Sequence, residues 1–454
     1  MLINQLVFKG SRIITILVIF AFECSSFRSI AQLYLAQGGG IRDYAGAFSP
    51  DTFVLEVKHL PNRIDHSFGL GKICFNITHT RPSDLKIQLR SPDGSTIWLT
   101  NRNGRDQGFG YSNTCFRTNG FNGYIHRASP PFEGEFIPDG RMEFLNNGQD
   151  PNGKWMLLIQ DLKAGGTGNL HLFSLSFEKD PMPNVSQQPC ADDNVSACAC
   201  PSNKRNCDLL PDLIILPAFT QNQIEEYAWN DPNYPGQLRF AATIANIGRG
   251  PMETRGRQEW YCGDERVDST TQCSDGNAPR QKLYQRIYQL WNGEMRYKEV
   301  PAGTNYYDSK VGHEHYHVDS WVEFRLVSKG TDGRKKLVAK ANKVSYCLWD
   351  TGACNNQDGL CTWDGVVYGE KNLINYGLGN YPGCDSGVQG ISVGGYDTYG
   401  LLYEGQSIEL PKNLSSGQYW LEIEIDPEHR YREMNKKNNL FTMPVQISRQ
   451  QKSQ

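Results

Sequence analysis

Short stretches in which hydrophobic and polar residues alternate recur along most of the chain. Residues 85–89 alternate and are followed by a Ser-Pro-Asp-Gly turn, and residues 168–177 alternate over their whole length. A period of two places alternate side chains on opposite faces of a β-strand, and such short strands between turns are typical of antiparallel sandwiches. We therefore predict an all-β fold, with a jelly-roll-like β-sandwich over residues 43–180.

The C-terminal half shows the same pattern with longer loops. Candidate strands include residues 238–244, 318–327 and 417–425. They predict a second domain over residues 209–448. Residues 181–208 are rich in Pro, Ser, Asn and Cys, without apolar periodicity, and we interpret them as a linker closed by disulfides.

The composition agrees with this organisation. The 454 residues suffice for two or three domains, and the 45 glycines favour turn-rich β structure. The formal charge is −3. This balance does not indicate nucleic-acid binding, and a mildly acidic surface would attract cationic amines only weakly.

Residues 1–31 are typical of a secretory signal peptide. Lys9 and Arg12 precede an apolar run over residues 13–22, and Ser29-Ile30-Ala31 offers small residues for cleavage. The run is short for a membrane span. An N-terminal anchor and a lipid anchor on Cys24 are the weaker alternatives. We expect a secreted, extracellular protein.

Removal of Cys24 with the signal peptide leaves 12 of the 13 cysteines, an even number that can pair completely in disulfides. Disulfides persist in oxidising compartments, so the cysteine usage supports export. Spacing does not fix the connectivity, and a zinc site is the alternative for the four linker cysteines. The pairings we expect are Cys74–Cys115, Cys262–Cys273, Cys347–Cys354 and Cys361–Cys384, with Cys190, Cys198, Cys200 and Cys207 pairing among themselves. Sequons at Asn76, Asn184, Asn194 and Asn413 predict a glycoprotein if the source glycosylates.

Three of the nine histidines lie within five residues, in the sequence His313-Glu314-His315-Tyr316-His317. On a strand these imidazoles would share one face. Three imidazoles suit a metal ion with an open coordination position, and imidazole favours copper, zinc, iron or nickel. The alternative is a polar strand face with three solvated histidines.

This motif resembles the copper-binding segment of lysyl oxidases. Two more segments resemble that family in the same order, Lys343-Val344-Ser345-Tyr346-Cys347 and Tyr396-Asp397-Thr398-Tyr399. The resemblance implies copper bound by His313, His315 and His317, and a lysine tyrosylquinone cofactor (LTQ) formed from Lys343 and Tyr399. It also implies an immunoglobulin-like β-sandwich with long loops.

The implied activity is that of a protein-lysine 6-oxidase-like copper amine oxidase. Such an enzyme converts peptidyl lysine or other primary amines to aldehydes and releases hydrogen peroxide and ammonia, with dioxygen as acceptor. A general base must remove a proton from the carbon beside the amine. Asp397 is our candidate, with Asp319 and Glu323 as weaker ones.

The chain departs from the family pattern at several positions. Family cysteines are replaced by Gly312, Gly395 and Gly405, and a histidine by Asn342. We therefore expect Cys384 to pair with a different partner, Cys361, in an enlarged loop. The departures affect loop geometry and substrate range, and they leave the three histidines and both cofactor residues in place.

The N-terminal region resembles the P domain of proprotein convertases. The matching residues include Asp84-Leu85, Ser91-Pro92 and Asn152-Gly153. No protease domain precedes it, so we expect this module to stabilise its neighbour or to bind an extracellular protein or surface. Calcium binding by Asp93, Asp106 and Asp161 is a further possibility.

Two other functions compete with the amine oxidase. One is a non-enzymatic secreted metal-binding adhesion or matrix protein, and the other is a copper or zinc enzyme without a quinone. Substitution of Lys343 and Tyr399 separates the three functions. The quinone amine oxidase would lose amine turnover in each variant, the enzyme without a quinone would keep its activity in both, and the matrix protein would show no turnover to lose.

Overall fold

The computed structural model describes residues 32–45, 49–104, 108–181, 190–191, 194–310, 313–330, 332–341, 344–357 and 359–450. The predicted signal peptide, Lys343 and Asp106 lie outside these residues. Strands dominate the described residues, so the all-β prediction is confirmed. Among them no helix is both long and apolar enough to cross a membrane.

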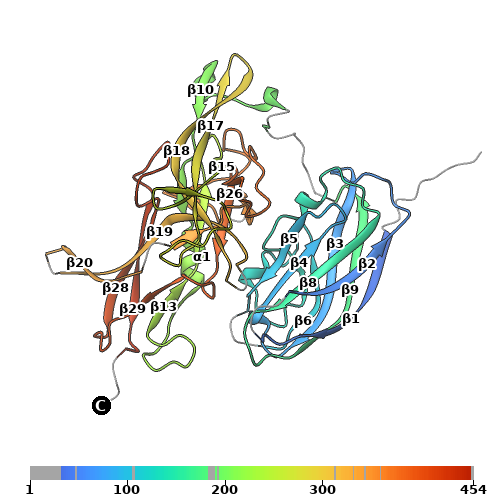
Figure 1. Ribbon diagram of the computed structural model, residues 1–454, viewed down its shortest axis with the longest axis horizontal. Helices are drawn as coiled ribbons and strands as arrows, with labels where there is room; N and C mark the ends of the chain where they lie inside the picture. Colours follow the sequence, from blue (N-terminus) through green and yellow to red (C-terminus); the bar gives the residue numbers. More distant parts are fainter. Residues whose placement is uncertain are drawn as a thin grey trace, which may run out of the picture. The chain divides into compact units, whose positions relative to one another are not determined.

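Two sheets make up the N-terminal β-sandwich (Figure 1). The first contains β1 (Gln32–Ile41), β9 (Gly168–Lys179), β3 (Phe68–His79), β6 (Tyr111–Phe116) and β7 (Gly134–Phe136), in that order. The second contains β2 (Asp51–Val57), β8 (Gly153–Asp161), β4 (Leu85–Arg90) and β5 (Thr96–Asn101). Short 3-10 turns connect them at Pro82–Asp84, Ile125–Arg127 and Met142–Leu145. Neighbouring strands are antiparallel except for β6 and β7.

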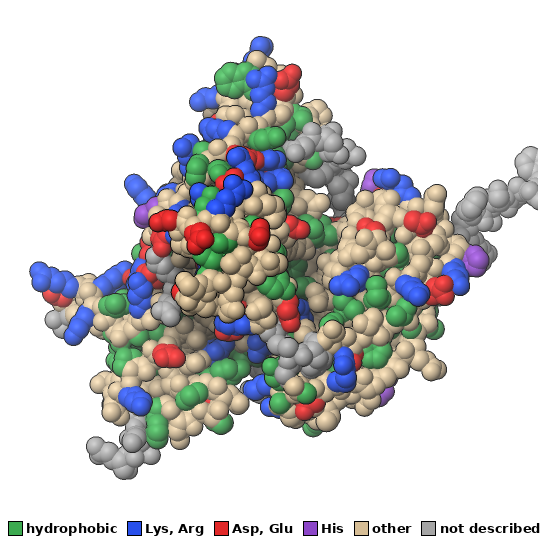
Figure 2. Space-filling view, viewed as in Figure 1, with side chains coloured by type: hydrophobic (Ala, Val, Ile, Leu, Met, Phe, Trp, Pro, Cys, Tyr) green, Lys and Arg blue, Asp and Glu red, His purple; other side chains and the backbone are tan. Residues whose placement is uncertain are grey.

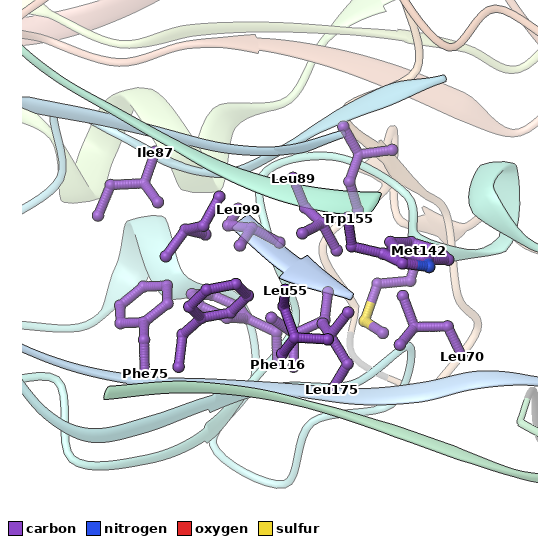
Figure 3. Packing of buried hydrophobic residues seen from close by; sticks show 14 of the residues in the cluster. Leu55, Leu70, Phe75, Ile87, Leu89, Leu99, Phe116, Met142, Trp155 and Leu175 are labelled. Carbon is purple, nitrogen blue, oxygen red and sulfur yellow. The ribbon is translucent and has the colours of Figure 1, made fainter. Parts of the chain in front are cut away.

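The alternating pattern builds the core of this sandwich. Leu89 and Trp155 from the second sheet face Phe116 and Leu175 from the first, and all four are buried (Figure 3). The Trp155 indole donates to the Pro151 carbonyl over 2.8 Å, which satisfies its one polar atom. Each such side chain contributes roughly 1.5–3 kcal/mol through burial.

The largest C-terminal sheet has the order β16-β15-β17-β18-β19-β28-β29. These strands are β16 (Glu265–Val267), β15 (Met252–Cys262), β17 (Arg280–Trp291), β18 (Glu294–Asp308), β19 (His315–Lys329), β28 (Gly417–Ile425) and β29 (Leu440–Ile447). Four more strands pair at its sides: β10 (Asn206–Leu209), β20 (Lys335–Lys340), β21 (Val344–Tyr346) and β25 (Val388–Ile391).

Smaller sheets pack against this sheet. One contains β11 (Leu213–Ile215), β14 (Ala242–Asn246), β26 (Gly395–Tyr399) and β22 (Gly352–Ala353). Another contains β12 (Ile224–Glu226), β13 (Gln237–Phe240) and β27 (Ser407–Glu409), and β23 (Thr362–Trp363) pairs with β24 (Val366–Val367). The helix α1 (Pro217–Asn222) and 3-10 turns at Val195–Ala197 and Pro201–Asn203 complete the elements.

The metal-motif strand β19 runs through the middle of the C-terminal core. Val318, Val322 and Phe324 are fully buried, and Phe324 packs edge-on against Phe240 at 4.8 Å. These residues belong to the apolar face that the alternation predicts. The rigid strand therefore places the polar side chains near its start in a defined position.

The C-terminal sheets carry acidic and basic side chains that are interspersed on the face drawn in Figure 2. Many are paired, such as Arg286 with Glu299 at 2.6 Å and Arg325 with Glu424 at 2.6 Å. This mixture agrees with the small net charge.

Six disulfides are present among the described residues. The predicted pairs Cys74–Cys115 and Cys262–Cys273 are confirmed. The four linker cysteines pair among themselves, as predicted, through Cys190–Cys198 and Cys200–Cys207.

Two predicted disulfides are wrong. Cys347 pairs with Cys384, and Cys354 pairs with Cys361. The reason is the path of the chain after Cys384: Gly390 donates to the Leu348 carbonyl over 2.9 Å, which brings this segment beside Cys347. Cys354 and Cys361 then close their own short loop.

Candidate metal centre

The three motif histidines converge at the start of β19. The ring centroids of His315 and His317 are 4.7 Å apart, and that of His313 lies 5.0 Å from His317 and 5.9 Å from His315. The Nε2 atoms of His315 and His317 are only 2.8 Å apart. Two ligand atoms about 2.0 Å from one metal at a right angle have this separation, so His315 and His317 fit one shared metal ion of the kind that imidazole binds, copper among them.

Burial keeps the imidazoles of His315 and His317 neutral. It lowers the pKa of His315 well below its usual value, with the neighbouring His317 as the next cause. Burial, followed by the charge of His313, lowers the pKa of His317 to about 3. A metal ligand must be unprotonated, so the site is prepared for a cation at neutral pH.

Asp308, at the end of β18, belongs to this cluster and was missed by the sequence analysis. Its Oδ2 lies 2.7 Å from His313 Nδ1 and 3.8 Å from His317 Nδ1. Although burial opposes it, the hydrogen bond and charge of His313 keep the pKa of Asp308 well below its usual range. Only the antiparallel register of β18 and β19, which places Asp308 opposite His315, could have identified it.

Tyr399 ends β26 and lines the same hollow as the three histidines. Its hydroxyl accepts a hydrogen bond from the Cys347 amide at 2.8 Å and donates to the Cys347 carbonyl at 3.2 Å. Burial raises the pKa of this phenol well above its usual value, and the nearby Asp397 adds to the shift.

Lys343 lies outside the described residues, but its neighbour Val344 begins β21 and lines this hollow with Ser345. β21 pairs with β19, with Tyr346 opposite Val318. The main chain next to Lys343 therefore reaches the hollow that contains His313, His315, His317 and Tyr399.

The three base candidates do not line the hollow. Asp397 is fully buried in β26, where neither carboxylate oxygen accepts a well-formed hydrogen bond; burial, and then Asp350, raise its pKa well above the usual value. Asp319 contacts Thr304 and Arg280 at 2.8 Å. Glu323 pairs with Arg325 and Lys340. Asp397 would have to lose its proton before acting as a base.

The two calcium candidates that the structure describes, Asp93 and Asp161, lie at opposite ends of β4. Asp93 follows the end of β4 and accepts hydrogen bonds from Ser91 and Ser95. Asp161 pairs with Leu85 at the opposite end of β4 and contacts His79 at 3.1 Å. Among the described residues of this sandwich, no three His, Cys, Asp or Glu side chains form a candidate metal cluster.

Family comparisons match both halves of the chain. Residues 72–177 match the proprotein convertase P-domain model, and residues 268–453 match the lysyl oxidase model. Human protein-lysine 6-oxidase is 29% identical over 137 residues, which are 30% of this chain and 27% of the relative. Human lysyl oxidase homolog 1 is 30% identical over 28% of this chain and 18% of its own length. Zebrafish (Danio rerio) lysyl oxidase homolog 2B is 29% identical over 38% of this chain and 19% of its own length.

The aligned part thus spans about a quarter of the human protein-lysine 6-oxidase and less of the two homologs. Among solved structures, a serine protease of Aeromonas sobria is 14% identical over 33% of this chain and 28% of its own, with a TM-score of 0.17. So low a score supports no inference. The two family matches confirm the resemblance that the motifs indicate: residues that match the P-domain model are followed by residues that match the lysyl oxidase model, and the second match includes the histidine cluster and Tyr399.

Proposed function

We propose that this protein is a secreted, copper-dependent amine oxidase that uses an LTQ formed from Lys343 and Tyr399. The observation that carries the proposal is the common hollow: it is lined by His313, His315, His317 and Tyr399, and it is reached by the strand next to Lys343. The lysyl oxidase match over residues 268–453 supports the same activity.

The substrate would be peptidyl lysine or another primary amine. In the overall reaction the amine loses two electrons and two protons to dioxygen, and water replaces the nitrogen. The products are an aldehyde, ammonia and hydrogen peroxide. Copper and the LTQ, when bound, supply the electron transfer.

The chain's own residues have separate roles in this proposal. His315 and His317 would hold copper from the start of β19, whose opposite face packs in the core, and His313 would hold it from the turn before this strand. A site held by the core needs little reorganisation. The main chain of Cys347 holds the Tyr399 hydroxyl, which leaves the ring facing the hollow. Secretion agrees with the six disulfides among the described residues.

Mass spectrometry of the copper-loaded protein tests the cofactor directly. We expect the peptides that contain Lys343 and Tyr399 to be covalently joined, with a positive quinone stain. Lys343→Ala and Tyr399→Phe should each abolish the joined peptide and amine turnover while copper binding remains. Two separate, unmodified peptides despite bound copper and air would contradict the enzyme and favour a metal-binding matrix protein.

A further inference from the structure

Asp308 lies beside the Nδ1 atoms of His313 and His317. Its Oδ2 is within 2.7 Å of His313 Nδ1 and 3.8 Å of His317 Nδ1. The Nε2 atoms of His315 and His317 meet 2.8 Å apart. The carboxylate thus approaches His313 and His317 through Nδ1, whereas His315 and His317 meet each other through Nε2.

The main chain holds both partners of the 2.7 Å contact in place. The other oxygen of Asp308 accepts a hydrogen bond from the Lys310 amide at 3.1 Å. The His313 amide donates to the Lys310 carbonyl at 2.9 Å. Asp308 itself is 8% exposed, so water competes little for its carboxylate. The contact is therefore built into the turn between β18 and β19.

This arrangement has a chemical consequence for metal binding. A neutral imidazole carries its proton on one nitrogen only, and a metal binds the other. A carboxylate that accepts the Nδ1 proton fixes this tautomer and ring orientation, and it makes Nε2 a better donor.

We propose that Asp308 is a positioning residue of the copper site, which holds the Nδ1–H of His313 so that Nε2 is presented to the metal. This inference rests on the proposed function, because it takes His313 to be a copper ligand. In this role the Asp308 carboxylate contacts the His313 ring and not the metal itself.

Copper affinity of the purified full-length chain tests the proposal, by competition with a chromophoric chelator. We expect Asp308→Ala to weaken copper binding about 10- to 100-fold. Asp308→Asn should lie between this variant and the wild type, since its amide oxygen still accepts the Nδ1 proton. The EPR spectrum of bound copper should change in both variants.

Glu265→Gln is the control for the loss of one negative charge. Glu265 is exposed on β16 and does not line the hollow of the histidine cluster, so its removal leaves the contacts of His313 unchanged. Its effect should not exceed about fivefold. Equal affinities and equal EPR spectra for wild type and Asp308→Ala would overturn the role of Asp308 while leaving the amine oxidase proposal intact. A wild-type chain that binds no copper would overturn both.

The wild-type protein offers a second test that does not depend on the folding of any variant. With 15N-labelled histidine and diamagnetic Cu(I), long-range 15N–1H spectra report which nitrogen of each ring is protonated. We expect His313 to carry its proton on Nδ1 and the metal on Nε2. Binding of the metal through His313 Nδ1, with Asp308 as a neighbouring ligand, would overturn the proposal.

Discussion

The rings of Tyr346 and Tyr399 are stacked face to face, with centroids 3.8 Å apart and planes inclined by 13°. Tyr346 is fully buried, and its hydroxyl accepts a hydrogen bond from Gln406 Nε2 at 2.6 Å. Tyr399 is thus fixed twice, by the Cys347 main chain at its hydroxyl and by Tyr346 across its ring. The proposed cofactor residue comes from β26, and the ring that supports it comes from β21, a strand of a different sheet.

Tyr346→Ala should destabilise the C-terminal domain by about 3–5 kcal/mol, because it removes a buried aromatic ring and leaves a cavity. Tyr346→Phe keeps the stack and loses one buried hydrogen bond, so it should cost only about 1–3 kcal/mol. Denaturant unfolding measures both. If the alanine variant were as stable as the phenylalanine variant, the stack would contribute nothing to the domain.

The strand pattern predicted much of the fold because side-chain alternation reports directly on burial. Leu85, Ile87 and Leu89 are all fully buried, as their spacing requires. The disulfides of the long loops were harder to predict from the sequence. Cys347 finds Cys384 because of a main-chain hydrogen bond between distant segments, and such a bond leaves no periodic signal in the sequence.

The candidate site divides in the same way. His315 and His317 lie on one strand and His313 in the turn before it, so the close spacing in the sequence keeps the three rings near one another. Their role as metal ligands stays a prediction. Asp308 joins them from another strand, and Tyr346 stacks on Tyr399 from a third. Those contacts depend on strand register and loop closure, which local sequence does not determine.

The Cys347–Cys384 disulfide should stabilise the native chain by about 2–4 kcal/mol, because it closes a 37-residue separation in the unfolded state. The double variant Cys347→Ser/Cys384→Ser would lose this contribution. The matched control, Cys262→Ser/Cys273→Ser, opens a separation of only 11 residues and should cost roughly 1 kcal/mol less. Urea unfolding without reductant compares the two, and a larger loss in the control would contradict this order.

Glu433 should make stability depend on pH. Burial raises its pKa from the usual 4.5 to about 7, although Asn439 and the Leu213 amide donate hydrogen bonds to it. A raised native pKa means that the folded state keeps the proton longer than the unfolded state. The protonated Glu433 carboxyl therefore makes its full contribution to the free energy of unfolding below pH 4.5. This contribution is lost as the pH rises through 7.

Glu433→Gln removes this titration, and it also loses one accepted hydrogen bond at every pH, because the amide nitrogen cannot accept from Leu213 or Asn439. Between pH 4.5 and pH 8 the stability of the variant should rise relative to that of the wild type by on the order of 2–3 kcal/mol. Chemical denaturation at the two pH values gives the difference. A wild type that gains stability relative to the variant between pH 5 and pH 8 would show that the native carboxyl is not held protonated.

Copper should stabilise the native protein, because the three histidines converge only after folding. At a free copper concentration one hundred times the Kd, binding contributes about 2.7 kcal/mol, and a chelator should reverse it. His315→Ala should remove this stabilisation, since it deletes one of the two Nε2 atoms that meet 2.8 Å apart. His66→Ala is the control, because His66 is exposed and lies in the N-terminal sandwich, outside the cluster. Calorimetric melts with copper and with chelator measure the effect, and a copper-dependent shift that persists in His315→Ala would place the metal elsewhere on the protein.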